Sequence, residues 1–377
     1  MRHSFKKYFR NVDKVLFLSV MLLIAIGLVL IASATHANIP GPHRYRFVFR
    51  QALFVIVNLI LGGYLMRFDY RILKHVAKPL YIFNLVMLVA VMVVGKSALG
   101  AQRWLQLGPI SIQPSEFSKA IMIVCLSSFV ESRLPTLTDF RSWIPVFLYV
   151  FVPFLLVMRQ PDLGTSLVFM AILLGTMIIC GFRIRYFLIM GGLGLASAPL
   201  IWHMLHEYQK NRIRVFLNPG LEPYGSGYHV IQSMIAIGSG LFFGRGLFNG
   251  TQSQLNFLPE NHTDFIFAVA GEEFGFVGVT LILILYLIVI VRGITIALHA
   301  SDDFGTLLAV GIVSMFTFHI LVNVGMTSNV MPVTGVPLPF MSYGVSSLTT
   351  NMLMVALLMN IHAPVSYTHL TLPTTSR

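Results

Sequence analysis

The sequence is poor in charge, and above all in acidic residues. Only 11% of its 377 residues are charged, whereas 56% are hydrophobic, and the mean hydropathy is +0.79. A soluble globular domain carries about a quarter of charged residues. The composition therefore excludes that class and indicates an integral membrane protein.

Cysteine and the common metal and nucleotide motifs are also scarce. Cys125 and Cys180 both fall inside apolar runs, where we expect small core residues rather than disulfide partners or metal ligands. The sequence contains no CxxC, HExxH or GxxxxGK[ST], which leaves zinc and P-loop chemistry unsupported. The net charge of +12 comes from basic residues spread over the loops, so we predict no nucleic-acid partner.

Long apolar runs make up most of the chain. A helix needs about 20 apolar residues to cross a hydrocarbon core of about 30 Å, and continuous runs do not fit the alternation of a β-barrel. We predict an all-α polytopic membrane protein with about ten transmembrane helices in one domain, residues 1–363. The predicted spans are 15–34, 52–67, 78–95, 116–131, 144–158, 163–181, 186–205, 265–292, 305–326 and 346–363. We expect the first run to be retained rather than removed as a signal peptide.

Lysine and arginine are denser in the short loops of one side, which predicts a cytoplasmic N-terminus. The opposite side then carries three long or unusual segments, 96–115, 206–264 and 327–345, of which the second is a large extracytoplasmic loop between the seventh and eighth spans. Because function concentrates in long ordered loops, we expect the site on this outer face. Residues 230–247 are apolar, short and glycine-rich, which indicates a re-entrant or interfacial segment. Residues 364–377 are expected to be a disordered or non-native tail.

Six of the fourteen acidic residues lie at or within the predicted span ends, where an unpaired charge is costly. They are Glu116, Asp162, Glu260, Asp264, Glu272 and Glu273. Glu116 has Lys119 at the spacing of a helical ion pair. Asp162 could simply cap the sixth span. We expect structural pairing for Glu272 and Glu273, which lie deeper in the membrane than an outside substrate would reach.

Asp264 stands where a polar loop enters a long apolar helix. Partial desolvation there raises the pKa of a carboxylate, so that it can accept a proton from a substrate. Thr263 or Asp264 could equally cap the helix, and we expect such a cap to fix Asp264 in place. The preceding loop is basic, and its Arg212 and Arg214 could hold phosphate.

Five motifs resemble the SEDS family of peptidoglycan glycosyltransferases, and most closely its RodA branch. They are GAQRWLQLGPISIQPSEFSK at 100–119, RQPDLGTSL at 159–167, GYHVIQSMIAIGSGLFFGRGL at 227–247, TQSQLNFLPENHTDFIFAVAGEEFGFVG at 251–278 and GVPLPFMSYGVSS at 335–347. The resemblance implies a ten-helix fold that polymerises lipid II into glycan strands on the outer face of the bacterial cytoplasmic membrane during cell elongation. It implies a class B penicillin-binding protein and membrane lipid as partners. It also places the essential acid at Asp264 and supporting residues at Trp104, Glu116, Lys119 and Asp162.

We hypothesise that Asp264 is the general base for the 4-hydroxyl of the incoming sugar, in a direct attack that inverts the anomeric centre. Candidates for the leaving pyrophosphate are the cations Arg103, Lys119, Arg212 and Arg214. Further candidate substrate-binding residues are Trp104, Glu116, Asp162, Glu260, His262, Thr263, Ser342 and Tyr343. No dedicated metal-ligand cluster or cofactor is evident, although Mg²⁺ or Mn²⁺ could share the phosphate charge. The alternatives are a lipid II flippase or transporter and a non-catalytic scaffold for cell-wall enzymes.

Overall fold

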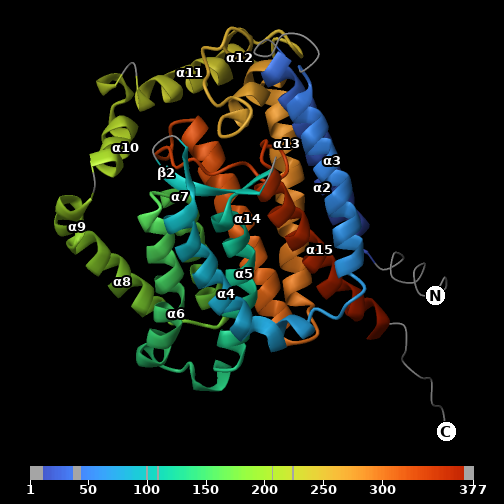
Figure 1. Ribbon diagram of the computed structural model, residues 1–377, viewed down its shortest axis with the longest axis vertical. Coiled ribbons are helices and arrows are strands. Elements are labelled where there is room, and N and C mark those ends of the chain that lie inside the picture. The colour runs from blue at the N-terminus through green and yellow to red at the C-terminus, as the bar shows by residue number, and fades with distance from the viewer. Residues whose placement is uncertain are drawn as a thin grey trace.

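The computed structural model describes residues 12–36, 44–98, 101–107, 110–205, 207–222 and 225–368. Long helices form a bundle; the small sheet, several loops and the helices within residues 226–254 lie toward one end, and the short helices within residues 184–217 run along one side (Figure 1). The longer helices are α2 (Lys14–His36), α3 (Arg46–Leu65), α4 (Ile72–Val94), α5 (Pro114–Glu131), α6 (Phe140–Arg159), α7 (Leu163–Ile179), α13 (Ile266–Leu298), α14 (Asp303–Thr327) and α15 (Val345–Thr368). The shorter ones are α8 (Ile184–Ala196), α9 (Ala198–Met204), α10 (Glu207–Leu217), α11 (Ser226–Ser239) and α12 (Thr251–Gln254), with 3-10 turns at Leu134–Thr136 and Pro219–Leu221.

Seven helices in the described ranges are long and apolar enough to cross a membrane. They are α2, α3, α4, α6, α13, α14 and the Val345–Ala363 part of α15, and each coincides with a predicted span. Helices α7 and α8 are apolar but shorter, and the predicted seventh span is divided between α8 and α9. The chain is thus a multi-pass membrane protein, whereas the number of ten spans stays a prediction.

The all-α prediction omitted a small sheet. Strands β1 (Lys96–Ala98), β2 (Ala101–Leu107) and β3 (Ile110–Ile112) pair antiparallel in the order β1-β2-β3, in what was expected to be a loop. Strands β1 and β3 have only three residues each, too few for the alternation of apolar and polar side chains to stand out in a sequence. Strand β2 contacts α4 and α5, so the sheet lies against the bundle at the end of these helices.

Helix α14 is the centre of the bundle. It packs against α13, α7, α5, α15 and α11, and most of its residues are buried. Two close approaches depend on glycine: a Cβ atom at Gly311 would lie 2.9 Å from Ile123 of α5, and one at Gly175 of α7 would lie 1.9 Å from Ser314. Small residues at such crossings let membrane helices pack closely. The consequence is a central helix that many elements hold in place.

Helix α13 is broken at Gly275, whose φ of 65° and ψ of −165° are not helical. The break leaves backbone groups without helical partners, and the loop after α11 supplies new ones. The hydrogen bonds are Arg245 N to Glu272 O (2.9 Å), Gly246 N to Glu273 O (3.1 Å), Phe276 N to Leu241 O (2.8 Å) and Val277 N to Phe242 O (3.1 Å). The predicted re-entrant segment is therefore helix α11 followed by a loop that is hydrogen-bonded into α13.

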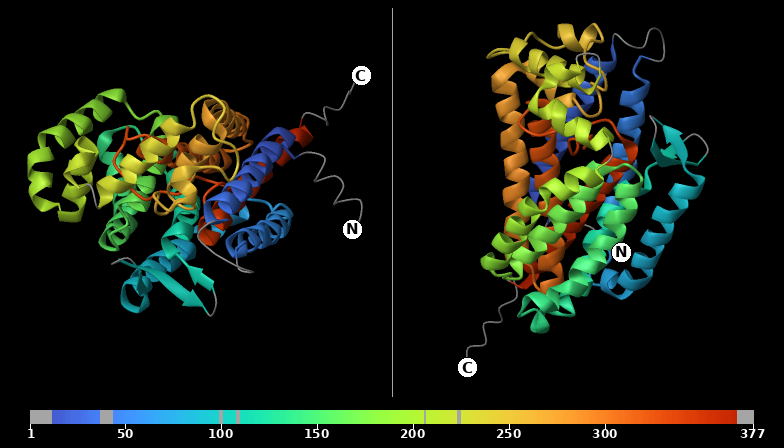
Figure 2. Two further views of the ribbon diagram at one scale, coloured as in Figure 1. Left: turned by 90° about the horizontal axis from the view of Figure 1, so that it is seen from above. Right: turned by 90° about the vertical axis from the view of Figure 1, so that its left-hand side faces the viewer.

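The two ends of the bundle differ in what they carry. The loop before α13 and the segment between α14 and α15 lie at the same end as α11 and α12, as Figures 1 and 2 show. The turns at the opposite end carry ion pairs, among them Arg71 with Asp302 and Lys74 with Glu131. Helix α15 continues through Thr368, so the first residues of the predicted tail are helical, and residues 369–377 lie outside the described part of the chain.

Candidate active site

Asp264 lies two residues before the start of α13. The N-cap of α13 is Phe265, and no side chain of the described residues caps it, so the predicted capping by Thr263 or Asp264 is wrong. The Asp264 carbonyl instead accepts a hydrogen bond of 2.9 Å from Nδ2 of Asn323, which also donates to Val336 O at 2.8 Å. Asn323 is fully buried on α14. The central helix therefore fixes the backbone of the candidate base.

The loop before α13 is also joined to the segment that precedes α15. Ser342 Oγ donates to Thr263 O at 2.6 Å, and Tyr343 N donates to His262 O at 2.9 Å. On the outer side of the same loop, Thr263 Oγ1 donates to a carboxylate oxygen of Glu260 at 3.0 Å. Four of the predicted site residues thus hold two loops together immediately before Asp264, and Glu260 lies exposed beside them.

An aromatic cluster supports this junction from α3. The His262 ring lies 5.1 Å from the ring of Phe47 and 5.7 Å from that of Tyr343. Gln51, one turn along α3 from Phe47, donates from Nε2 to Ser342 O at 3.1 Å. Burial lowers the pKa of His262. Its ring is therefore neutral near pH 7, which suits a packing role better than a role as a phosphate-binding cation.

Residues 334–336 form the surface on which the other parts of the site meet. A Cβ atom built on Gly335, whose φ is 73°, would lie 3.4 Å from Oδ2 of Asp264. A Cβ atom at Gly164, in the first turn of α7, would lie only 2.8 Å from Thr334 O. Arg212 of α10 donates to the same Thr334 carbonyl at 3.3 Å. One extended backbone segment therefore brings α7, α10 and the Asp264 carboxylate to one place.

The carboxylate of Asp264 is half-buried and surrounded by charges of both signs. Burial raises its pKa to about 6; Glu260 and Asp162 act in the same direction, whereas Arg212 and Arg103 act against them. Such a group is largely ionised at neutral pH and still basic enough to accept a proton from a hydroxyl group. The two guanidinium groups can stabilise an anion bound beside it.

Asp162 and Arg103 meet at the start of α7. Asp162 caps this helix by accepting a hydrogen bond of 3.2 Å from Thr165 N, as the capping alternative predicted. Arg103 of β2 donates from Nε to Gln160 O at 2.9 Å, and from Nη2 to Pro161 O. Trp104 is half-buried and follows Arg103 on the strand, so its side chain points to the opposite face of the sheet.

Glu116 and Lys119 form the predicted ion pair, but in the interior of the bundle. Lys119 Nζ lies 2.9 Å from each carboxylate oxygen of Glu116 and 3.2 Å from Nε2 of His319, and the lysine is only 1% exposed. His319 Nδ1 lies 3.1 Å from Pro337 O, to which it donates. All three donors of the ammonium group are thus used internally. The geometry does not fit the expected role of Lys119 at a pyrophosphate; the pair supports the segment at Pro337 instead.

Arg212 and Arg214 lie on different faces of α10. Two residues are separated by about 200° on a helix, so the two side chains diverge. Arg214 is exposed, forms an ion pair of 3.4 Å with Glu207 and lies 5.8 Å from the ring of Trp202. Arg212 is half-buried, and its charge acts on Asp264. The structure therefore brings Arg212 to the site and leaves Arg214 outside it.

Glu272 and Glu273 have structural partners, as expected, but these are neutral donors rather than cations. The carboxylate of Glu272 accepts hydrogen bonds from Gln252 N at 2.8 Å and Ser253 N at 3.1 Å. Glu273 accepts a hydrogen bond from Ser33 Oγ of α2. Both acids tie the region around α12 and α2 to the upper part of α13.

The sequence reasoning missed three residues that hold the site together, namely Gln51, His319 and Asn323. A signal was present in α14, where His319 and Asn323 stand four residues apart in a mostly apolar span. That spacing places both on one helix face, and polar groups inside a span need partners. Only the fold shows that the partners are Pro337 and Asp264.

Sequence comparison identifies close relatives over nearly the whole chain. The family described as "Cell cycle protein", which covers FtsW, RodA and SpoVE, matches residues 13–367. The chain is 39% identical over 361 residues to stage V sporulation protein E of Bacillus subtilis, covering 93% of this chain and 96% of that protein. It is 41% identical over 309 residues to the peptidoglycan glycosyltransferase MrdB of Escherichia coli, covering 82% and 83% respectively.

Solved structures agree with these relatives. The fold is similar to the crystal structure of the rod shape determining protein RodA of Thermus thermophilus, with a TM-score of 0.69, 28% identity, and coverage of 93% of this chain and 96% of that one. It is also similar to a chain in a structure that describes the coordination of polymerization and crosslinking by a peptidoglycan synthase complex. That match has a TM-score of 0.80 and 32% identity, and it covers 93% of this chain and 97% of the other.

Proposed function

The chain belongs to the FtsW/RodA/SpoVE family and is a peptidoglycan glycosyltransferase, and from this premise we propose that it polymerises lipid II during cell elongation. The proposed reaction takes place at the outer face of the bacterial cytoplasmic membrane, at the end of the bundle that carries Asp264. The likeness to a rod shape determining protein supports the assignment to elongation. The gathering of the ordered loops at this end supports the assignment of the face.

The observation that carries the proposal is the environment of Asp264. Its backbone is held by Asn323 on the central helix, while its carboxylate lies between acids and guanidinium groups and has a pKa of about 6. In the proposed step, the ionised carboxylate removes the proton from the 4-hydroxyl of the acceptor sugar as the oxygen attacks the anomeric carbon of the donor. The bond from that carbon to the pyrophosphate breaks, and the configuration inverts.

Arg212 and Arg103 are proposed to stabilise the leaving pyrophosphate. Both act electrostatically on Asp264, and Arg212 also donates to the Thr334 carbonyl, next to the Gly335 backbone that adjoins the Asp264 carboxylate. Arg103 uses two of its five N–H donors on the turn before α7, which orients the guanidinium and leaves donors for a phosphate oxygen. Pyrophosphate is a good leaving group once its charge is neutralised, so the mechanism needs one base and no second carboxylic acid.

The proposed partner is a class B penicillin-binding protein, which would crosslink the strands that this chain makes. The likeness to a chain of a peptidoglycan synthase complex supports this pairing. A Mg²⁺ or Mn²⁺ ion shared with the pyrophosphate also stays a prediction. Among the described residues, no three His, Cys, Asp or Glu side chains gather as a metal site, so such an ion would be held largely by the substrate. Adding a chelator to the polymerisation assay tests this.

The flippase and scaffold alternatives have less support. The flippase reading rested on charges inside the spans, which a translocation path requires. Lys119 is committed to Glu116 and His319, and Glu272 is held by backbone amides. A scaffold would not need a desolvated carboxylate whose ionised form two arginines stabilise.

The test is a polymerisation assay with lipid II and the purified protein in complex with its penicillin-binding partner. We expect glycan strands on a gel from the wild type and none from Asp264→Ala. Asp139→Ala is a matched control, because Asp139 is an exposed acid at the start of α6. Full-length strands from Asp264→Ala would show that Asp264 is not the catalytic base. If the wild type also made no strands, a role in transport or as a scaffold would be favoured.

A further inference from the structure

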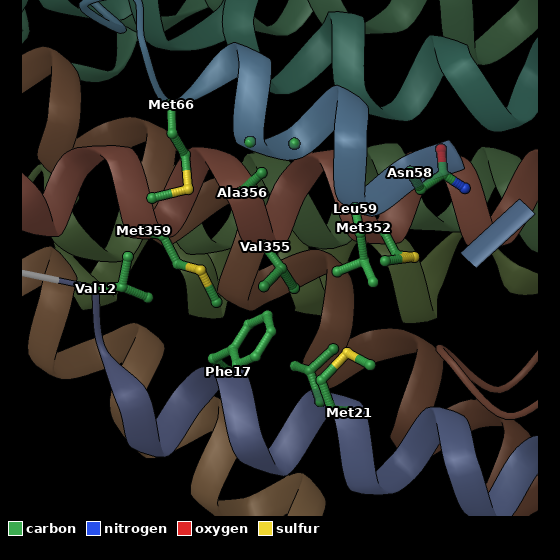
Figure 3. Close-up of a pocket in the computed structure, with 13 residues that line it drawn as sticks. Val12, Phe17, Met21, Asn58, Leu59, Met66, Met352, Val355, Ala356 and Met359 are labelled. Carbon is green, nitrogen blue, oxygen red and sulfur yellow. The ribbon is translucent and has the colours of Figure 1, made fainter. Parts of the chain in front are cut away.

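A groove of about 290 Å³ lies between α2, α3 and α15, away from the candidate active site. Its lining is almost entirely apolar and includes Met21 of α2, Met66 of α3, and Met352 and Met359 of α15. Figure 3 shows these side chains on both sides of an open channel. Asn58 is the polar lining residue, and it donates from Nδ2 to Thr349 Oγ1 at 3.1 Å. Flexible methionine side chains suit an apolar ligand of variable shape.

The position of the groove specifies the kind of ligand. All three helices are long and apolar enough to cross a membrane, so a groove between them is open to apolar molecules of the bilayer. Along α3 the groove runs from Asn58 to Met66, which at 1.5 Å per residue is about 12 Å. This is close to half of a hydrocarbon core of about 30 Å. The groove is therefore as deep as one leaflet.

The leaflet is the one at the end opposite Asp264. Val12, Met66 and Met359 line the end of the groove at which α2 begins and α3 ends (Figure 3). Two exposed cations lie close in sequence to these lining residues: Lys14 is two positions after Val12, and Arg67 directly follows Met66. Cations at the end of a membrane helix attract the headgroups of anionic lipids.

We propose that this groove binds an acyl chain of an anionic bilayer phospholipid from the leaflet opposite the candidate active site. The chain lies along the four methionines, and the headgroup meets the cationic ends of α2 and α3. This site is distinct from the lipid-linked substrate and does not depend on the chemistry at Asp264.

The chain offers a matched pair of variants for the test. Gly63 lines the groove, and a Cβ atom built there meets no described atom within 4 Å, so Gly63→Phe adds a large side chain to the groove at a position with open space around its Cβ atom. Gly191 of α8 has the same open surroundings on an exposed face and does not line the groove, so Gly191→Phe controls for adding a phenylalanine to an exposed apolar helix.

The probe is a phosphatidylglycerol with a diazirine in its acyl chain, added to nanodiscs of neutral lipid that contain the full chain. After irradiation, we expect adducts on peptides that include Met21, Met66 and Met352. We expect this labelling to fall several-fold in Gly63→Phe, to persist in Gly191→Phe, and to decrease in the wild type when unlabelled phosphatidylglycerol competes.

Four results would overturn the proposal. Labelling of Gly63→Phe at the wild-type level, or an equal loss in both variants, would mean that the groove is not the site. Competition by a polyprenyl phosphate in place of phosphatidylglycerol would mean that the ligand is an isoprenoid chain. Equal labelling by a phosphatidylcholine probe would show that the site does not select an anionic headgroup. The competition experiments use the wild type, so they decide the matter even if Gly63→Phe does not fold.

Discussion

The pH dependence of polymerisation follows directly from the surroundings of Asp264. A general base works only when ionised, so the rate should rise with pH and reach a plateau above its pKa. With a pKa of about 6, only about a tenth of Asp264 is ionised at pH 5, and the rate should be about a tenth of the plateau. At the ordinary value of 3.8, more than about nine-tenths would be ionised at that pH, and the profile would be flat.

The neighbouring charges predict how this profile moves in variants. Glu260 raises the pKa of Asp264, so Glu260→Gln should shift the acidic limb to lower pH. Arg212 lowers that pKa, so Arg212→Gln should shift the limb to higher pH. Glu207→Gln is the matched control, because Glu207 is an exposed acid of α10 that pairs with Lys210 and should leave the limb in place.

The assay is the initial rate of strand formation from fluorescent lipid II below KM, measured from pH 4.5 to 8 in one mixed buffer at constant ionic strength. The substrate titrates identically in every variant, so a difference between variants reports on the enzyme. A limb that moves the same way in Glu260→Gln and Arg212→Gln, or that also moves in Glu207→Gln, would refute Asp264 as the titrating base. A wild-type rate that does not change between pH 5 and 7 would refute it equally.

Three further predictions concern stability. The folded-state pKa of Asp264 is above its unfolded value of 3.8, so the protein loses stability as pH rises from about 4 to 6. At about 1.4 kcal/mol per pKa unit, Asp264→Asn should raise the free energy of unfolding by up to about 3 kcal/mol above pH 6 and leave it unchanged below pH 4. Thermal unfolding at several pH values measures this difference. Asn323→Ala and Asn360→Ala each remove an amide that donates to two backbone carbonyls, so each should lower the free energy of unfolding by about 2 to 4 kcal/mol. Only Asn323→Ala should also reduce the polymerisation rate, by about tenfold or more, because Asn360 forms its hydrogen bonds at the opposite end of the bundle. Lys119→Met leaves the buried carboxylate of Glu116 unpaired and should lower the free energy of unfolding by about 3 to 5 kcal/mol. Adding Glu116→Gln to the same chain should restore part of this stability. If the effects of the two substitutions were simply additive, the pairing would be contradicted.

The sequence predicted what depends on local pattern. Long apolar runs located the seven helices that can span a membrane, and the spacing of Glu116 and Lys119 predicted their ion pair. The capping of α7 by Asp162 is equally local, because acceptor and donor are three residues apart. None of these predictions required knowledge of which elements meet in space.

The predictions that failed depend on tertiary contacts. The residue that fixes Asp264 is Asn323, 59 positions away, so no local rule for helix caps could identify it. Arg212 and Arg214 were indistinguishable while their segment was read as a loop, because only a helix separates their directions. The burial of Lys119 follows from its contact with His319, 200 positions away.

The broken helix α13 has a consequence for biogenesis. If α13 entered the bilayer alone, it could close as a regular helix, with the amides of Phe276 and Val277 bonded to the carbonyls of Glu272 and Glu273. The break at Gly275 instead pairs these four groups with the preceding loop. Because that loop is synthesised before α13, its hydrogen-bonding groups are already present when the helix emerges. The break should therefore form only when the preceding loop is present, and a chain without residues 241–246 should still insert α13, but as an unbroken helix.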